Sequence, residues 1–182
     1  MMMKNLTLLL SLLLALLVGS SLIAGCKQPA NPYEIDPKLI EAQKKADDDT
    51  IQTYLTRHAI TTYRRLDSGI YLVPLTDGPA ANPLIKAGQK VTVNYVGKFI
   101  NKRKETQVFD ASSTNRTDCG CFSFRNGSGG VIAGWDQATL QMRQGDRKLV
   151  LIPSYLAYSF KGSGPIPGST PLLFDMEILS VE

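Results

Sequence analysis

Residues 131–135 of this 182-residue chain read Val-Ile-Ala-Gly-Trp, and residues 152–158 read Ile-Pro-Ser-Tyr-Leu-Ala-Tyr. The first stretch holds the only tryptophan of the chain. It predicts a short helix over residues 135–142 with Gly145 as its stop, because glycine is common just beyond helix ends. The second stretch follows an apolar run and predicts a strand that leads into a loop carrying Tyr158.

Strand signals surround this helix. Residues 91–96 alternate apolar and polar side chains, which is the period of a strand with one buried face. Residues 76–79, Thr-Asp-Gly-Pro, indicate a turn because Asp, Gly and Pro each favour turn geometry. Many short antiparallel strands with one short helix indicate an α+β domain. The predicted strands are residues 70–75, 91–96, 107–109, 121–124, 148–152 and 172–179.

Two further motifs extend the pattern, Tyr-Val-Gly at residues 95–97 and Val-Phe-Asp-Ala-Ser at residues 108–112. Together with the two stretches above, they resemble the FKBP-type peptidyl-prolyl cis-trans isomerases over roughly residues 68–182. The resemblance implies a curved antiparallel β-sheet of five to six strands wrapped around one short α-helix, here with an N-terminal helical extension. It also implies isomerisation of X-Pro peptide bonds, a reaction that needs no cofactor and no metal.

The resemblance assigns roles to particular side chains. Trp135 forms the floor beneath the proline ring, Asp110 is a carboxylate at the pocket edge, and Tyr158 donates its hydroxyl to a substrate carbonyl. The backbone N–H of Ile132 binds a ligand carbonyl. The implied partners are proline-containing polypeptides as substrates and FK506-like macrolides as inhibitors. The implied walls of the pocket are Tyr95, Phe109, Phe122, Val131, Ile132, Ile166 and Phe174.

Most of these residues also have a structural interpretation, since an aromatic residue in a strand usually belongs to the core. Asp110 stands between Phe109 and Ala111, and a carboxylate is costly to bury there without a partner. A salt bridge to Arg116 is therefore an alternative for Asp110, and both roles are compatible. We assign four other apolar residues to the core: Phe124, Leu140, Met142 and Leu151.

The chain departs from minimal family members around the rim of the implied pocket. Residues 98–108 and 110–122 are both longer than in those members. Ser159 and Phe160 follow Tyr158, where the family usually has glycine. We expect Phe160 to add a wall or to alter the loop.

The N-terminus predicts export. Lys4 precedes the apolar residues 8–17, and small residues then lead to Cys26, as in a signal peptide. Small residues directly before a cysteine resemble the lipobox of bacterial lipoproteins, in which the cysteine becomes the lipidated N-terminus. An uncleaved anchor is the alternative, because residues 6–24 nearly reach the ~20 residues of a membrane span. We expect residues 1–25 to be a signal peptide and Cys26 to anchor the protein to a membrane of the bacterial cell envelope.

The predicted organisation beyond this signal has three parts. Residues 26–37 form a tether, residues 38–66 a helical extension, and residues 67–182 the isomerase domain. The run of acidic residues at positions 47–49 suggests a second helix start or an exposed turn. One apolar face of the extension then carries Ile51, Tyr54, Leu55 and His58, with His58 at its boundary.

The remaining cysteines are Cys119 and Cys121. A local disulfide, two free thiols and pairing between molecules all remain open, and a thiol-transfer role rests on this tripeptide alone. With His58 as the only histidine, a zinc site would lack ligands. The net charge of +4 includes a basic run at residues 102–104, which we interpret as a solvated loop without a role in binding nucleic acid.

The sequence therefore predicts a peptidyl-prolyl isomerase that assists the folding of exported proteins at the cell envelope. The alternative is a non-catalytic lipoprotein that uses the same fold to hold a protein partner. The residues 38–58 would then form an interaction or dimerisation helix.

Overall fold

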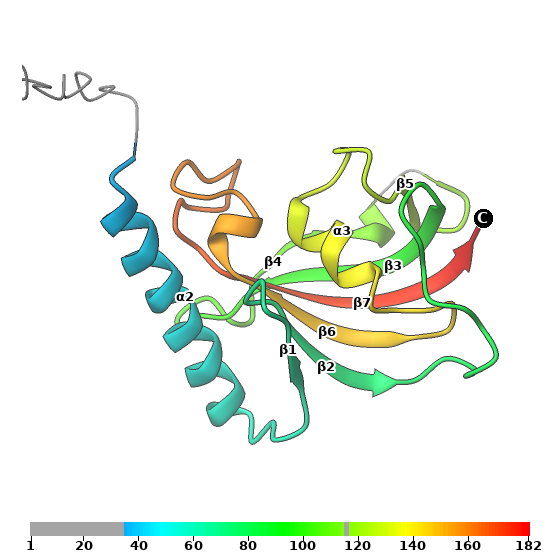
Figure 1. The fold of residues 1–182 in the computed structure, drawn as a ribbon, viewed down its shortest axis with the longest axis horizontal. Helices are drawn as coiled ribbons and strands as arrows, with labels where there is room; N and C mark the ends of the chain where they lie inside the picture. Colours follow the sequence, from blue (N-terminus) through cyan, green and yellow to red (C-terminus); the bar gives the residue numbers. More distant parts are fainter. Residues whose placement is uncertain (1–34, 115–116) are drawn as a thin grey trace, which may run out of the picture. The chain divides into compact units, whose positions relative to one another are not determined.

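The computed structural model describes residues 35–114 and 117–182, and residues Asp36–Glu182 form one compact unit (Figure 1). The predicted signal peptide, Cys26 and Arg116 lie outside the described residues. The helices are α2 (Pro37–Arg57) and α3 (Ala133–Thr139), with short 3₁₀ helices η1 (Ser112–Thr114) and η2 (Ser154–Leu156). The strands are β1 (Arg64–Arg65), β2 (Tyr71–Thr76), β3 (Lys90–Phe99), β4 (Val108–Ala111), β5 (Phe122–Arg125), β6 (Arg147–Ile152) and β7 (Leu172–Val181).

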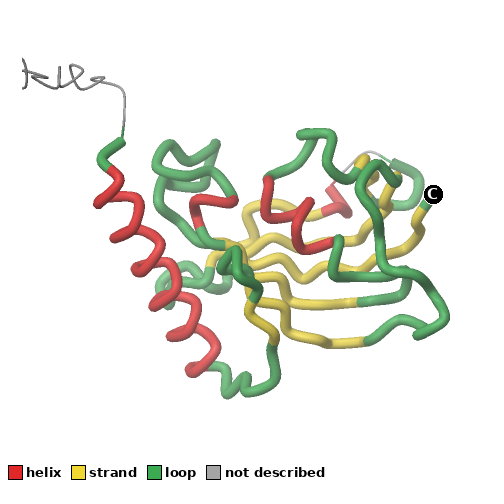
Figure 2. The backbone as a smooth tube through the Cα atoms, viewed as in Figure 1, coloured by secondary structure: helices red, strands yellow, loops and turns green. Residues whose placement is uncertain are grey.

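These strands form one antiparallel sheet in the order β1-β2-β6-β7-β3-β4, with β5 also paired to β3 (Figure 2). The sheet thus has seven strands, more than the five to six expected. The difference arises because the long β3 pairs with β5 through its first half and with β4 through its second half, while β1 adds only two residues. The predicted antiparallel sheet with one short helix and an N-terminal helical extension is otherwise confirmed.

Alternation along the strands divides the apolar side chains between the two faces of the sheet. In β6, Val150 and Ile152 belong to the core that contains Trp135 of α3, whereas Leu151 between them belongs to a second cluster. The second cluster lies under α2 and contains Ile51, Tyr54, Leu55, Tyr71, Val73, Ile100, Leu151 and Leu173. The two helices therefore cover opposite faces of one sheet.

Helix α2 begins where local chemistry favours a start. Asp36 caps it by accepting a 2.8 Å hydrogen bond from the backbone N–H of Lys38, and Pro37 occupies the first turn. Its predicted apolar face is buried at Ile51, Tyr54 and Leu55, while His58 lies exposed just beyond the helix end. Neither helix in the described ranges is long and apolar enough to cross a membrane.

The interpretation of residues 47–49 as a second helix start or an exposed turn is wrong. The structure has one continuous helix through this run, and Asp47 is buried with 1% of its surface exposed. Asp48 is only partly exposed and forms an ion pair with Arg65, whereas Asp49 is exposed. Three identical residues in sequence thus have three different environments, because they occupy successive directions around the helix.

Helix α3 starts two residues earlier and ends three residues earlier than predicted, at Ala133–Thr139 instead of residues 135–142. Gly145 is not its stop: it lies in the turn before β6 with φ +90°, and its N–H donates a 2.9 Å hydrogen bond to Ile178 O. Gly134 allows the helix to approach the sheet, because a Cβ there would lie 2.4 Å from Ile152 Cγ2. The close approach places Trp135 directly over the sheet.

The predicted core residues divide into two groups. Phe124 and Met142 are buried in the core with α3, and Leu151 is buried in the cluster under α2. Leu140 is only partly buried, at the C-cap of α3. Leu140 belongs to neither buried cluster, so its assignment to the core is wrong.

Candidate active site

A pocket of about 430 Å³ opens between α3, the sheet and the loop after β6. Its volume lies within the range of small-ligand sites. The sequence-predicted catalytic and substrate-binding residues all line this one pocket, although they come from β3, β4, β5, α3, β7 and two loops. The lining residues are Tyr95, Phe109, Asp110, Phe122, Gly130, Val131, Ile132, Trp135, Tyr158, Ser163, Gly164, Pro165, Ile166 and Phe174.

Aromatic rings form the base of the pocket around Trp135, which is 4% exposed. The Tyr95 and Phe174 rings meet the indole edge-on, with centroids 4.9 and 5.2 Å away, and the Phe122 ring lies at 6.0 Å. Edge-to-face contacts at these distances are favourable for aromatic pairs. The indole N–H of Trp135 is buried and has no hydrogen-bond partner among the described residues. The base is thus rigid and largely apolar.

Gly97 on β3 leaves space for the Phe109 ring at the side of the pocket. A Cβ at this position would lie 2.5 Å from Phe109 Cε2 and 3.2 Å from Phe174 Cε1. Both distances are too short for an undisturbed contact. The glycine therefore lets the Phe109 ring lie across β3 against Phe174, with ring centroids 5.6 Å apart.

Asp110 provides the carboxylate at the rim. Its Oδ2 accepts a 2.6 Å hydrogen bond from the Tyr95 hydroxyl, and its Oδ1 accepts a 2.9 Å bond from the N–H of Ala111. Asp110 itself is exposed, so the expected cost of burying a carboxylate does not arise. The alternative partner, Arg116, lies outside the described residues. The observed partner, Tyr95, joins the carboxylate to the aromatic base.

Tyr158 reaches the same pocket from the loop after β6. Burial, followed by the negative charge of Asp110, raises the pKa of the Tyr158 hydroxyl above its ordinary value of 10.0. Burial, the hydrogen bond to Asp110 and the charge of Asp110 also hold the pKa of Tyr95 well above its usual range. Within the described part of the chain the Tyr158 hydroxyl makes no hydrogen bond, so it is a protonated donor free to bind a ligand.

Ile132 presents a second donor. It occupies the N-cap position of α3, where its C=O accepts from the N–H of Trp135 at 2.9 Å. Its own N–H makes no backbone hydrogen bond within the described ranges. The pocket therefore has an apolar base with two hydrogen-bond donors and one carboxylate around it.

Four lining residues are not among the predicted site residues: Gly130, Ser163, Gly164 and Pro165. The sequence signal for the residues 163–165 is the density of Gly and Pro between residues 162 and 168, which is typical of a tightly turned loop. Phe160 does not line the pocket and is 37% exposed. Ser159 adopts φ +52°, a conformation that favours glycine, and its C=O accepts the N–H of Ser169 at 2.7 Å.

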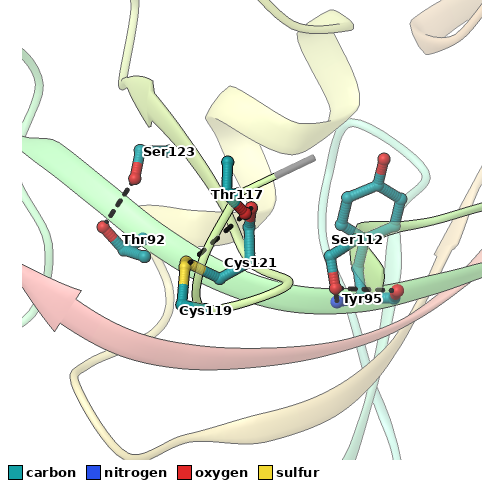
Figure 3. Close-up of a disulfide and its surroundings, with 7 residues drawn as sticks. All are labelled: Thr92, Tyr95, Ser112, Thr117, Cys119, Cys121 and Ser123. Atoms are coloured by element: carbon teal, nitrogen blue, oxygen red, sulfur yellow. Dashed lines mark hydrogen bonds between the residues drawn. A yellow bond between two sulfur atoms is a disulfide. The ribbon is translucent and has the colours of Figure 1, made fainter. Parts of the chain in front are cut away.

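The expanded segment between β4 and β5 contains a disulfide that joins Cys119 and Cys121 (Figure 3). Cys119 is exposed and Cys121 is buried. The Thr117 hydroxyl donates a 3.0 Å hydrogen bond to the backbone oxygen of Cys121. At the start of the same segment, Ser112 Oγ accepts the N–H of Tyr95 at 3.1 Å, which ties the segment to β3.

Among the described residues, no group of three or more His, Cys, Asp or Glu side chains could hold a metal ion. The nearest carboxylate to the pocket, Asp110, is bonded to a hydroxyl and a backbone N–H. The side chains that line the pocket offer apolar surface and hydrogen-bonding groups.

Comparison with known proteins identifies the family. The family model of the FKBP-type peptidyl-prolyl cis-trans isomerases matches residues 82–179. The chain is 38% identical over 97 residues to FK506-binding protein 2 of Dictyostelium discoideum, a match that covers 53% of this chain and 68% of that protein. It is 37% identical over 100 residues to FK506-binding protein 5 of the same organism, covering 55% of this chain and 6% of that protein.

A solved structure agrees in fold. The crystal structure of a peptidyl-prolyl cis-trans isomerase from Pseudomonas syringae pv. tomato matches with a TM-score of 0.61 and 31% identity, over 78% of this chain and 95% of that chain. The chain belongs to the FKBP-type peptidyl-prolyl cis-trans isomerase family, which confirms the family predicted from the sequence. Some relatives are much longer, since the match spans 6% to 20% of their length.

Proposed function

We propose that this protein is a peptidyl-prolyl cis-trans isomerase that assists the folding of exported polypeptides at the bacterial cell envelope. The observation that carries the proposal is the pocket, in which an aromatic base, a carboxylate and two free donors converge. Family membership supports the reaction class. The location rests on the lipobox-like residues before Cys26, which are a sequence signal.

The reaction needs a site of this kind. Rotation about an X-Pro bond passes through a twisted state in which amide resonance is lost, against a barrier of about 18–20 kcal/mol. The uncatalysed process takes ~10–100 s and can limit folding. In the twisted state the carbonyl is less polarised and the prolyl nitrogen is no longer conjugated, so an apolar aromatic pocket favours that state over the planar amide. Catalysis is then differential binding of the twisted form.

Each group has a place in this scheme. Trp135 lies beneath the proline ring, with Tyr95 and Phe174 closing the sides. Tyr158 donates its hydroxyl to a substrate carbonyl, and its raised pKa keeps the proton in place at neutral pH. The backbone N–H of Ile132 holds a second carbonyl and so orients the peptide across the pocket.

The same pocket suits FK506-like macrolides as inhibitors. Two carbonyl-binding donors beside an apolar cup would accept the carbonyl groups of a macrolide in place of those of the peptide. The names of the relatives, FK506-binding proteins 2 and 5, support this part of the proposal. A macrolide of this class should therefore compete with the substrate.

The test is the exchange rate between cis and trans forms of a short X-Pro peptide, measured by NMR with the purified protein and with two variants. We expect Trp135→Leu and Asp110→Ala each to lower kcat/KM by on the order of tenfold or more, as for loss of a group that contacts the transition state. Asp49→Ala, an exposed change on α2, is the control and should keep wild-type activity. A folded protein that binds the peptide without accelerating exchange would establish the alternative, a binding lipoprotein.

The location has its own test. The chain should partition with membranes when expressed in a bacterium that processes lipoproteins, and Cys26→Ser should release it into the soluble envelope fraction. Mass spectrometry of the N-terminal peptide would show the lipid on Cys26. A chain that keeps residues 1–25 and stays in the membrane after Cys26→Ser would instead be held by an uncleaved anchor.

A further inference from the structure

A buried carboxylate on α2 lies outside the pocket and is not used by the scheme above. Asp47 is 1% exposed, although it follows a polar stretch of helix and precedes two more aspartates. No basic side chain forms an ion pair with it among the described residues. Burying a carboxylate without a cation is costly unless hydrogen bonds satisfy its oxygens. The groups that donate hydrogen bonds to Asp47 therefore show which part of the protein it fixes.

Those partners belong mainly to one residue of the loop that carries Tyr158. Asp47 Oδ2 accepts a 2.8 Å hydrogen bond from the backbone N–H of Ser154 and a 2.7 Å bond from the Ser154 hydroxyl. Asp47 Oδ1 accepts a 2.8 Å bond from Gln43 Nε2. Burial raises the pKa of the Asp47 carboxyl, and the bonds from Ser154 and Gln43 oppose that rise. Ser154 is itself buried, at 1% exposed.

Ser154 in turn holds the backbone on both sides of Tyr158. Its C=O accepts the N–H of Ala157 at 3.0 Å and the N–H of Ser159 at 2.8 Å. Tyr158 lies between these two residues. The N–H and hydroxyl of Ser154 are thus held by Asp47 on α2. The C=O of Ser154 in turn holds the segment that carries the Tyr158 hydroxyl.

A second contact supports the same loop. The Tyr155 hydroxyl donates a 2.8 Å hydrogen bond to Ser68 O, over Gly69, where a Cβ would lie 2.3 Å from that hydroxyl oxygen. The ammonium of Lys44, also on α2, lies 5.8 Å from the centre of the Tyr155 ring. Figure 1 shows α2 running beside the orange segment that contains η2. The helix therefore meets the loop at two successive residues.

We propose that Asp47 is a positioning residue, which holds Ser154 and through it sets Tyr158 beside Asp110 in the prolyl pocket. The helical extension is then part of the working enzyme. This inference rests on the proposed function for its kinetic effect, because it concerns the donor that binds the substrate carbonyl.

The role differs from simple docking of the helix. Ile51, Tyr54 and Leu55 already bury the apolar face of α2 against the sheet. A buried carboxylate adds little net stability compared with a well-packed apolar side chain. Its two bonds to Ser154 instead specify the conformation of one loop, as a hydrogen-bonded group does and an apolar one does not.

The experiment is a double-mutant cycle in the full-length chain in detergent, with kcat/KM for an X-Pro peptide as the readout. Asp47→Ala should lower kcat/KM by on the order of tenfold, the loss expected when a hydrogen bond to a charged group is removed. In a Tyr158→Phe background the same change should have less than about a twofold effect, because no hydroxyl remains to be positioned. Asp49→Ala is the matched control on the same helix and should have no effect in either background.

Two conservative variants separate positioning from folding. Asp47→Asn keeps an oxygen that accepts the Ser154 N–H, so it should restore most of the activity. Ser154→Ala removes one of the two bonds to Oδ2 and should show a smaller loss that also depends on Tyr158. If Asp47→Ala does not fold, the cycle between Ser154→Ala and Tyr158→Phe carries the test.

Two results would overturn the inference. One is a folded Asp47→Ala protein with wild-type kcat/KM, and the other is a loss of the same size whether or not the Tyr158 hydroxyl is present. A wild-type protein without catalysis would refute the proposed function alone, and NMR would still test the positioning. In that case Asp47→Ala, but not Asp49→Ala, should shift the amide signals of Tyr158 and Ser159 and speed hydrogen exchange at the N–H groups of Ala157 and Ser159, which donate to Ser154. Unchanged signals would refute it.

Discussion

Tyr95→Phe removes a single hydroxyl and tests whether the hydrogen bond from Tyr95 to the Asp110 carboxylate matters for activity. The change deletes the 2.6 Å bond from Tyr95 Oη to Asp110 Oδ2 and leaves the buried ring in place. A hydrogen bond to a charged group contributes about 1.5–3 kcal/mol when buried. Because Asp110 is exposed, water replaces part of that bond, and we expect a loss of about 1–2 kcal/mol in the free energy of unfolding.

The assay compares stability with activity. For a folded unit of this size, the loss corresponds to a decrease of ~2–8 °C in melting temperature. We expect kcat/KM to fall by about threefold to tenfold, because Asp110 loses the contact that orients it at the rim of the pocket. Tyr71→Phe is the matched control: it removes a 2.8 Å bond from a buried tyrosine to Asp48, on the face of the sheet opposite α3. It should destabilise the protein by ~1 kcal/mol or less, since Asp48 keeps its bonds from Arg65 and Gln52.

Only Tyr95→Phe is expected to lose activity. If Tyr95→Phe is destabilised but keeps wild-type kcat/KM, the hydroxyl serves the fold and Asp110 needs no orientation. If Tyr71→Phe loses as much activity as Tyr95→Phe, the kinetic effect reports general destabilisation. Either outcome would remove the argument that links this bond to the site.

Three further predictions follow from other contacts. Ser159→Gly should raise the free energy of unfolding by about 0.5–1 kcal/mol in denaturant titrations, because Ser159 has φ +52° and a side chain is strained there; a loss of stability would contradict this. Ile51→Ala should lower the free energy of unfolding by about 2–5 kcal/mol in the same assay, since the Ile51 side chain of α2 is fully buried. Leu39→Ala, at an exposed position of the same helix, should change it by less than about 0.5 kcal/mol. Burial raises the pKa of Asp47 above its ordinary 3.8, so the folded state holds that proton more tightly than the unfolded state does. The stability of the wild type relative to Asp47→Asn should therefore be greatest below pH 3.8 and fall as pH rises through the folded value, and a difference that grows with pH would show the opposite shift.

Local patterns predicted much of the fold and the pocket. The alternation of β3 and the apolar stripe of α2 are periodic signals, and both elements are present in the structure. The short helix that holds the single tryptophan near its start is also present, although its bounds differ from the prediction. The pocket residues were identified by resemblance to a family, and the structure brings them to one place. Composition alone would have assigned the same aromatics to the core, because burial in a core and exposure to a pocket look alike in a sequence.

Local patterns did not predict every feature. Leu140 carries an apolar side chain but remains partly exposed at the C-cap of α3. Glycine is a residue type common just beyond helix ends, but Gly145 lies in the turn before β6. The sequence left the pairing of Cys119 and Cys121 open, and the structure joins their sulfurs in a disulfide.

The sequence by itself determined the elements and their apolar faces, because hydrophobic periodicity and turn chemistry act over a few residues. Only the tertiary structure decided that the helical extension belongs to the site. Asp47 is indistinguishable in sequence from Asp48 and Asp49, and its burial arises because Ser154, 107 residues further along, is brought against α2. The free energy of a buried charge depends on the donors that surround it, and those donors come from a part of the chain that local patterns do not reach.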